Sequence, residues 1–425
     1  MRGLSSACVS FLTIVSTTSL IVTLCLAHGA AKYGILQKND ALSFQAPHLQ
    51  AEAAGAMLSR RNLSESYISG NGFRNVMSES ERRMKLRQMQ AWQQQQQQKQ
   101  EKLSTDDNRP SGVVYQYIVP PPINMTARLS LYAQFPNLPD IDAPVSTALC
   151  GIVKDAEPYL DEWVDYHFGL GFHTIYLIDN SKEHELQKWQ NKRRDLGYSV
   201  RVMPKPGTHR QMYGYHMCAA EHKGDHTYMA FFDVDEFMVL KKHETINEFL
   251  TMHLPKGALA ISWFIFGAGY TSMYAPLPVT KRFTYRDGVE KSERHKQWGN
   301  VKSIVKTSDY GGYPQSPHSM KTNRKTAGTD KAWLDTTGGG DFDKIGAVNS
   351  NRPVDVAVIH HYKYLSPKEF YWKSCVRKTV DDQFKDCGSG YTTPYKGKIH
   401  DDSAWQMLKK NVPKYAMYDA FEDFM

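Results

Sequence analysis

Two aspartates, Asp233 and Asp235, are the residues of this 425-residue sequence best placed to do chemistry. They follow the apolar run Tyr228–Phe232, which is typical of a strand at the centre of a sheet. If the chain stays extended, side chains alternate, so the two carboxylates point the same way, about 7 Å apart along the strand. The spacing therefore predicts one site that contains both acids at the end of a buried strand.

A divalent cation would stabilise such a pair, because two carboxylates at the end of an apolar strand repel each other and lose hydration. Oxygen ligands suit Mg²⁺ or Mn²⁺, with coordination positions left for phosphate oxygens. Such an ion would act as a Lewis acid on a diphosphate leaving group. The alternative is that the acids cap a helix or are simply solvated. Glu236 joins Asp233 and Asp235 as a catalytic candidate, although strand alternation turns it away from the pair and favours a structural ion pair.

The elements before the acid pair predict a parallel sheet. Leu149–Lys154 is a short apolar run of buried-strand type, and a helix with one apolar face follows from about Pro158. Gly169 ends that helix, and a second strand, Thr174–Ile178, runs up to Asp179. Strand, helix and strand in this order form a βαβ unit, and such sheets bind ligands at the carboxyl ends of their strands.

Later segments extend the same alternation and complete an α/β prediction: a Rossmann-like, mostly parallel sheet with helices on both faces. Further expected helices are Glu185–Asp195 and Tyr213–Glu221, and further expected strands are Tyr198–Met203, Ala258–Ser262 and Val354–Ile359.

The N-terminus predicts entry into the secretory pathway. Residues Ala7–Ala27 carry no charge and have the length of one bilayer span, so residues 1–31 are either an uncleaved signal anchor or a cleaved signal peptide. Residues 32–145 have the composition of a largely disordered stem, with the glutamine run Gln93–Gln98 and a proline-rich, extended spacer. The catalytic domain is expected at residues 146–425. We therefore expect a single-pass type II membrane protein of the Golgi or another secretory membrane, with its catalytic domain luminal, or a secreted protein if the leader is cleaved.

Sequons and cysteines agree with that compartment. Asn62 and Asn124 begin glycosylation triplets in segments expected to be exposed. Outside the leader there are four cysteines, an even number that suits an oxidising lumen, and Cys375 with Cys387 is the pairing we favour over four buried free thiols. The formal net charge is +8, but no run of alternating basic and aromatic residues predicts nucleic-acid binding. A diphosphate-bearing donor or an acidic glycan fits the same excess.

The sequence resembles glycosyltransferase family 92 and the related family-2-like glycosyltransferases over about residues 148–375. The most specific part is the block Asp-Val-Asp-Glu-Phe at Asp233–Phe237, within the order of elements given above. The other residues that carry the resemblance are Cys150–Asp155, Tyr159, Leu160, Glu162–Val164, Tyr166, His167, Gly171, Tyr176, Asp179–Ser181, Gln211, Tyr215, Cys218, Trp263, Phe266, Gly267, Gly269, Lys302, Ile304, Val305, His318, His361, Tyr362, Ser366, Phe370 and Lys373.

This resemblance implies a GT-A fold, a nucleotide-sugar donor such as a UDP-sugar, a glycan or polysaccharide acceptor, Mn²⁺ or Mg²⁺, and inversion at the anomeric carbon. By position, Asp233 would face the donor's ribose or sugar, Asp235 would bind the metal, and His361 would complete the metal site. Imidazole is compatible with Mn²⁺. The donor-binding candidates are Lys154, Asp155, Asp179, Gln211, Asp233 and Trp263.

The general base is not determined by spacing. An inverting transfer needs a carboxylate that takes the proton of the acceptor hydroxyl. The acids available further along the chain are Asp287, Glu293, Asp335, Asp341 and Asp343. His318 either contacts a phosphate or the acceptor or is a surface histidine, and Trp263 either stacks on a sugar or is a buried strand residue. The segment Lys321–Asn351, with its glycine triplet, is either an acceptor or lid loop or a flexible insertion.

Two other classes of protein fit parts of the pattern. A haloacid-dehalogenase-like phosphatase also has Asp-x-Asp after an apolar strand, but normally on the first strand of its domain, whereas here βα units precede it. A non-catalytic luminal protein that binds a metal or glycans could use the same acids. Calcium sites, however, usually need more oxygen ligands in one loop than Asp233, Asp235 and Glu236 provide.

Overall fold

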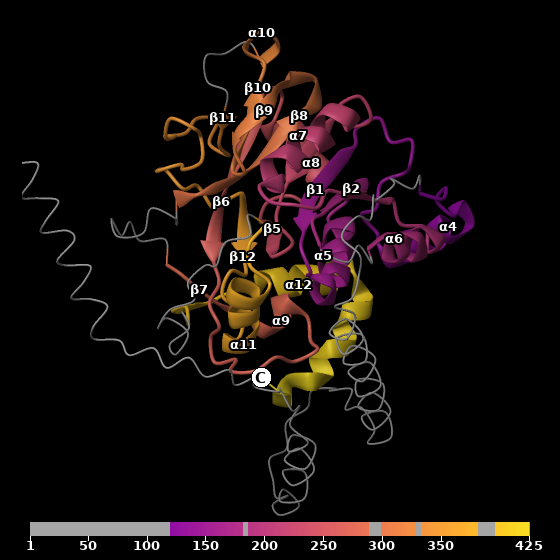
Figure 1. Cartoon of the computed structure of the whole chain (residues 1–425), viewed down its shortest axis with the longest axis vertical. Helices are drawn as coiled ribbons and strands as arrows, with labels where there is room; N and C mark the ends of the chain where they lie inside the picture. Colours follow the sequence, from indigo (N-terminus) through magenta and orange to yellow (C-terminus); the bar gives the residue numbers. More distant parts are fainter. Residues whose placement is uncertain (1–119, 182–185, 289–298, 328–332, 381–395, 425) are drawn as a thin grey trace, which may run out of the picture. The chain divides into compact units, whose positions relative to one another are not determined.

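The structure, a computed structural model, describes residues 120–181, 186–288, 299–327, 333–380 and 396–424 (Figure 1). All of them belong to the second of two units, Val76–Met425. The expected signal anchor, most of the expected stem, the sequon at Asn62 and Cys387 lie outside the described residues. No helix within the described ranges is both long and apolar enough to cross a bilayer.

The central element is a mixed sheet. Its parallel part has the order β3-β2-β1-β4, and the order continues β8-β6-β12-β5, with β11 beside β6. Strand β8 is antiparallel to both β4 and β6, β12 is parallel to β6, and β5 is antiparallel to β12. The strands are β1 Thr147–Val153, β2 Thr174–Asp179, β3 Val200–Pro204, β4 Tyr228–Phe231, β5 Glu236–Leu240, β6 Ala258–Ile265, β8 Val301–Lys306, β11 Trp333–Leu334 and β12 Ala357–His361.

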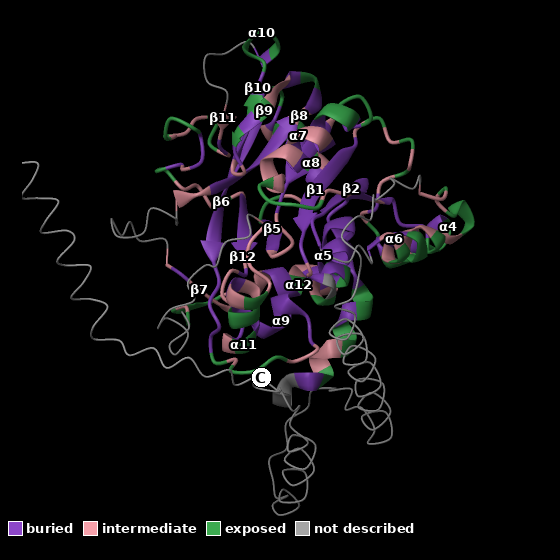
Figure 2. Cartoon of the chain, in the orientation of Figure 1, coloured by how far each residue is buried: buried purple, intermediate pink, exposed green. Residues whose placement is uncertain are grey.

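Helices cover both faces of this sheet. Alternate residues of β1 belong to two different hydrophobic clusters: Leu149 packs in one with helix α5, and Cys150 packs in the other with helix α7. Since neighbouring residues of a strand point to opposite faces, the two clusters lie on opposite sides of the sheet. The principal helices are α5 Glu157–Gly169, α6 Leu186–Asp195, α7 Arg210–His222, α8 Ile246–His253 and α12 Ser403–Asn411. Figure 2 shows the central strands buried along their length.

Shorter elements complete the described chain. They are the helices α9 Val279–Arg282, α10 Arg324–Ala327 and α11 Pro367–Tyr371, the helical turns Thr307–Asp309, Trp372–Val376 and Pro413–Phe424, and the strands β7 Tyr285–Arg286, β9 Tyr310–Ser316, β10 Ser319–Thr322 and β13 Ile399–His400. The predicted α/β class with helices on both faces is confirmed, but the sheet is less uniformly parallel than expected because β8 and β5 run antiparallel.

The end of the expected stem differs from the prediction. The proline content predicts an extended spacer, whereas helix α4, Met125–Gln134, forms there. The exposed sequon residue Asn124 caps the helix, because its side chain accepts a hydrogen bond from the Ala127 backbone N–H at 3.1 Å. Leu131 and Phe135 are buried in the main hydrophobic cluster. This part of the segment therefore packs on the catalytic domain, because local apolar spacing outweighs the neighbouring prolines.

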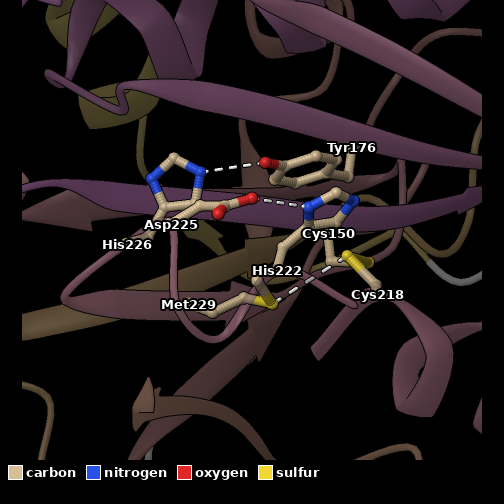
Figure 3. Close-up of a disulfide and its surroundings, with 7 residues drawn as sticks. All are labelled: Cys150, Tyr176, Cys218, His222, Asp225, His226 and Met229. Atoms are coloured by element: carbon tan, nitrogen blue, oxygen red, sulfur yellow. Dashed lines mark hydrogen bonds and ion pairs between the residues drawn. A yellow bond between two sulfur atoms is a disulfide. The ribbon is translucent and has the colours of Figure 1, made fainter. Parts of the chain in front are cut away.

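A disulfide joins helix α7 to the central strand β1 (Figure 3). Cys150 and Cys218 are bonded with their Cα atoms 6.6 Å apart, and both are fully buried. Beside them the Tyr176 hydroxyl and His226 Nε2 are hydrogen bonded at 2.9 Å. Two of the four cysteines expected in an oxidising compartment are thus paired. The pairing favoured for Cys375 involves Cys387, outside the described ranges.

Candidate active site

A tight turn, not an extended strand, contains the acid pair. Strand β4 ends at Phe231, and the Glu236 N–H donates to the Asp233 carbonyl at 3.0 Å. The Asp233 N–H in turn donates to Glu236 Oε2 at 2.9 Å. The extended geometry expected for Asp233–Glu236 is therefore wrong at this point. The turn brings the Glu236 carboxylate back toward Asp233, which strand alternation would have prevented.

Helix α5 and strand β1 hold this turn in place. The Trp163 indole N–H donates to the Glu236 carbonyl at 2.9 Å. The Trp163 ring fits directly over Gly151, where a Cβ atom would lie 2.9 Å from the ring. A side chain at residue 151 would therefore push the indole away from the turn, which explains why a glycine stands in a central strand.

Asp233 is bound by groups from two other elements. Gln211 Nε2 and the Tyr215 hydroxyl, both on α7, donate to Asp233 Oδ1 at 2.7 and 2.8 Å. Lys302 Nζ, on β8, donates to Asp233 Oδ2 at 2.9 Å and lies 3.1 Å from Glu236 Oε2. The structural ion pair expected for Glu236 is therefore present. The Asp233 side chain still keeps 28% of its exposure, so it remains accessible to a ligand.

A second group forms where β5 pairs with β12. His361 lies opposite Glu236 in this antiparallel ladder, so their side chains share one face of the sheet. His361 Nε2 is 3.6 Å from Asp235 Oδ2, and His361 Nδ1 is 3.9 Å from Glu236 Oε1. One ligand atom each from Asp235, Glu236 and His361 lies within 4.8 Å of the others. Lys373, next to helix α11, donates to the Asp235 carboxylate.

Burial and the two lysines determine the charges of the site. Burial raises the pKa of Asp233 and of Asp235, but Lys302 and Lys373, respectively, outweigh it, so both pKa values lie below the usual range. Burial and the neighbouring carboxylates hold the pKa of Glu236 well above its usual range. Burial also lowers the pKa of His361, which keeps the imidazole neutral and able to coordinate a metal.

The donor atoms of this group fit a divalent cation. Glu236 Oε1 and His361 Nδ1 are buried and have no hydrogen-bond partner among the described residues. Unpartnered buried polar atoms are costly, and a bound cation would offset that cost. Carboxylate oxygens and one imidazole nitrogen are a donor set that suits Mn²⁺ or Mg²⁺. Of the predicted metal ligands, Asp235 and His361 belong to this group with Glu236, and Asp233 lies beside it, bound to Lys302.

The donor-binding candidates lie in two places. Lys154 and Asp155 follow β1, and Asp179 is the last residue of β2, in register with Val153 at the end of β1. Lys154 Nζ donates to the Thr379 carbonyl at 2.7 Å, and the Asp155 N–H donates to Ser181 Oγ at 2.9 Å. Asp179 Oδ1 accepts from the Ser181 N–H at 2.9 Å. The Asp179 carboxylate, the Ser181 hydroxyl and the Lys154 ammonium therefore order the loops at the carboxyl edge of the parallel strands.

Of the other three donor-binding candidates, Asp233 belongs to the acid group itself, and Gln211 and Trp263 contact that group or its neighbours. Gln211 binds Asp233, and the Trp263 ring lies 4.6 Å from His361 and 5.3 Å from His318, centre to centre. Trp263 is only 5% exposed, which favours the buried-strand alternative over a sugar platform. His318 is also largely buried, and burial lowers its pKa to about 4, so it is neutral and not a surface histidine.

Lys302 and Lys373 contact the two aspartates of the candidate site, and spacing along the sequence predicts a role for neither. Lys302 is fully buried in the apolar strand β8. A lysine inside such a run is itself a signal, because a buried ammonium needs a carboxylate partner. Lys373 gives no comparable signal, since its partner Asp235 is 138 residues away in the sequence.

Comparison with known proteins identifies the class to which this fold and site belong. The family model of glycosyltransferase family 92 matches residues 144–389, more than half of the chain. The chain belongs to glycosyltransferase family 92 and is a glycosyltransferase. The resemblance described in the sequence analysis is thus confirmed, and the phosphatase and non-catalytic alternatives are not supported.

Similar curated proteins come from plants. A glycosyltransferase family 92 protein of Oryza sativa subsp. japonica is 25% identical over 154 residues, which cover 36% of this chain and 26% of that protein. One of Arabidopsis thaliana is 29% identical over 97 residues, which cover 23% of this chain and 17% of that protein. This chain therefore matches only about a quarter or less of the length of these relatives.

Two solved structures show partial similarity to this chain. TarS 1-349 of S. aureus in complex with UDP is 14% identical, covering 39% of this chain and 47% of that one with a TM-score of 0.25. The mannosyltransferase PcManGT of Pyrobaculum calidifontis, in complex with GDP-Man and Mn²⁺, is 10% identical, covering 33% and 44% with a TM-score of 0.23. These similarities are too low to assign a donor or a metal to this chain.

Proposed function

We propose that this glycosyltransferase moves a sugar from a nucleotide-sugar donor, a UDP-sugar, to a hydroxyl of a glycan or polysaccharide, with a divalent cation and with inversion at the anomeric carbon. The observation that carries the proposal is the group Asp235, Glu236 and His361, whose ligand atoms lie within 4.8 Å of one another. Asp233, with its own counter-charge Lys302, stands directly beside it.

The cation would be held by Asp235, Glu236 Oε1 and His361, and when bound it would supply Lewis-acid stabilisation of the diphosphate. Side chains of the protein balance the charge of the site and orient the Asp233 carboxylate. Lys373 and Lys302 place two ammonium groups among three carboxylates, so the site is not strongly negative before the donor arrives. Gln211 and Tyr215 fix the Asp233 carboxylate through Oδ1, in an orientation suited to accept a hydrogen bond from a ribose or sugar hydroxyl.

The compartment follows from the sequence alone. We propose that the leader places the catalytic domain in the lumen of the Golgi or another secretory membrane as a type II protein, or outside the cell if it is cleaved. The Cys150–Cys218 disulfide supports an oxidising compartment. Endoglycosidase sensitivity of the full chain tests this, and a cytosolic, unglycosylated product would contradict it.

The reaction is tested by incubating the full chain with UDP-glucose, UDP-galactose, UDP-N-acetylglucosamine and GDP-mannose, with and without Mn²⁺. We expect release of the free nucleoside diphosphate from one or more UDP-sugars, and we expect EDTA to abolish it. Equal release in EDTA would contradict the metal requirement. Release from GDP-mannose alone would contradict the choice of a uridine donor.

A further inference from the structure

Four of the five acids that the sequence leaves open as general base can be compared in the structure, because Glu293 lies outside the described ranges. Asp335 accepts hydrogen bonds from the Thr337 N–H and from Asn349 Nδ2, both at 2.9 Å. Asp343 Oδ1 accepts from the Ala347 N–H at 2.7 Å. Asp341 is exposed. Asp335 and Asp343 therefore order the loop in which they lie, and Asp341 faces solvent.

Asp287 differs from these three. Its side chain is buried, with the residue only 2% exposed, and neither carboxylate oxygen has a hydrogen-bond partner among the described residues. A buried carboxylate normally has a partner, because its desolvation is costly otherwise. The fold thus maintains an uncommitted acid at this position.

An isolated bridge beside β6 places Asp287 in one row with the metal-site residues. The Asp287 N–H donates to the Ile265 carbonyl at 3.1 Å, and Phe266 pairs with Arg286 in an antiparallel bridge, so Asp287 lies opposite Ile265. Ile265 is in register with His361 on β12, and His361 is in register with Glu236 on β5. Residues in register share a face of the sheet.

Contacts on the other face agree with this assignment. The Arg286 guanidinium lies 3.9 Å from the centre of the Phe264 ring, and the rings of Phe266 and His360 are 4.4 Å apart. These residues alternate with Asp287, Ile265 and His361 and so point away from them. With about 4.8 Å between neighbouring strands, Asp287 lies about 10 Å across the sheet from His361.

We infer that Asp287 is the general base of the proposed transfer reaction. This assignment rests on the proposed function, since it assumes that a donor diphosphate is held at Asp235, Glu236 and His361. The acceptor hydroxyl oxygen attacks the anomeric carbon, and a new C–O bond forms. The bond from that carbon to the diphosphate oxygen breaks, and its electron pair leaves with the diphosphate. The hydroxyl proton passes to the Asp287 carboxylate and from there to solvent.

The environment of Asp287 suits a base. Burial raises the pKa of Asp287 to about 6, although Arg352, Arg286 and Lys398 lower it in part. A carboxylate with such a pKa is ionised at neutral pH and is more basic than an ordinary aspartate. None of the three cations forms an ion pair with the Asp287 carboxylate within the described chain, so no counter-charge occupies its oxygens.

The test uses the full chain and the UDP-sugar that the wild type hydrolyses fastest, with water as acceptor. Asp287→Asn should lower kcat by about 100-fold to 10,000-fold, because the positioned base is lost. Mn²⁺-dependent binding of UDP, measured by calorimetry, should stay within about twofold. The thermal unfolding midpoint should not fall, because the variant removes an unpaired buried charge. Asp287→Glu should recover part of kcat, and Asp341→Asn is the matched control with wild-type kcat.

Three results would overturn the assignment. If the wild type is active and Asp287→Asn keeps the wild-type kcat, the assignment of Asp287 as general base is refuted, while the proposed function stands. A lower unfolding midpoint together with weaker UDP binding in Asp287→Asn would show a structural role instead. If the wild type hydrolyses none of the nucleotide sugars, the proposed function itself fails, and the base assignment fails with it.

Discussion

The two halves of the central sheet end in different ways. At the carboxyl ends of the parallel strands β1 and β2, Asp155 and Asp179 are engaged with Ser181, and Asn180 Nδ2 donates to the carbonyls of Lys205 and Gly207 at 2.8 Å. In the half that contains β6, β12 and β5, buried carboxylate oxygens of Glu236 and Asp287, together with His361 Nδ1, have no partner among the described residues. Beside the parallel strands, the unpartnered buried atoms of the described chain include Asn180 Oδ1 and histidine nitrogens but no carboxylate oxygen.

That difference distinguishes carboxylates that are engaged in the fold from buried carboxylates that are left open for a ligand. In the parallel half, the side chains replace hydrogen bonds that the loops would otherwise lose, so they stabilise the structure. In the mixed half, buried polar atoms without a hydrogen-bond partner lower the stability of the fold, which is typical of a site that binds a ligand. Substitutions in the two halves should therefore affect different measurements: stability in one and turnover in the other.

The largest expected effect is on turnover in the mixed half. Asp235→Ala and Asp233→Ala should each lower nucleotide-sugar hydrolysis by at least about 100-fold, since one removes a proposed metal ligand and the other the acid beside it. Neither should unfold the domain, because both side chains are partly exposed. Circular dichroism checks the fold. Wild-type turnover in either variant, with metal still required, would refute the assignment of that residue.

Lys302 connects the two roles, so its loss should affect stability as well as activity. Lys302→Met leaves Asp233 and Glu236 without their buried counter-charge and should cost about 3–5 kcal/mol in the free energy of unfolding. Urea denaturation measures this free energy. Lys306→Met is the matched control, because Lys306 lies on the same strand and its ammonium donates to the Pro255 carbonyl at an exposed position.

The pH dependence of this loss has a definite sign. Without Lys302 the two buried carboxyls gain pKa values above those of the unfolded chain, so the deficit should grow as pH rises from about 4 and shrink below it. A deficit that does not change with pH would show that lost packing of the lysine stem, and not charge, explains the effect.

Removal of the Cys150–Cys218 disulfide tests the parallel half of the sheet, where we expect substitutions to change stability rather than turnover. Replacing Cys150 and Cys218 with alanine together should lower the free energy of unfolding by about 2–4 kcal/mol, because the bond closes a long loop between residues 68 apart. Turnover of the folded fraction should change little. A non-reduced peptide map confirms the bond in the wild type, and free thiols at both positions in the native protein would contradict it.

Local sequence patterns were enough for the parallel half and for much of the site. The apolar strands and the helix between them predict β1, α5 and β2, and the acid block predicts where the site lies. His361 was assigned to the site by the family resemblance and not by spacing, and the structure brings it together with Asp235 and Glu236. The turn at Asp233–Glu236 was not predictable from periodicity, because a side chain that folds back onto the backbone decides it.

The rest of the site depends on contacts between distant segments. Lys302 is 69 residues from Asp233, and Lys373 is 138 residues from Asp235. Neither pairing follows from spacing, since only the sheet order brings these segments together. The same holds for Asp287, one of the five acids that spacing leaves open. Its burial without a partner among the described residues and its place beside β6 distinguish it in the structure.

We propose that Asp235, Glu236 and His361 bind a divalent cation and that this cation binds the diphosphate of the donor. Electron paramagnetic resonance of Mn²⁺ titrated into the full chain tests it most directly, with UDP added and with His361→Ala and Asp235→Asn as variants. We expect the wild type to bind one Mn²⁺. The affinity for Mn²⁺ should increase when UDP is present and should be at least about tenfold lower in both variants. Equal Mn²⁺ affinity in the wild type and both variants would contradict it.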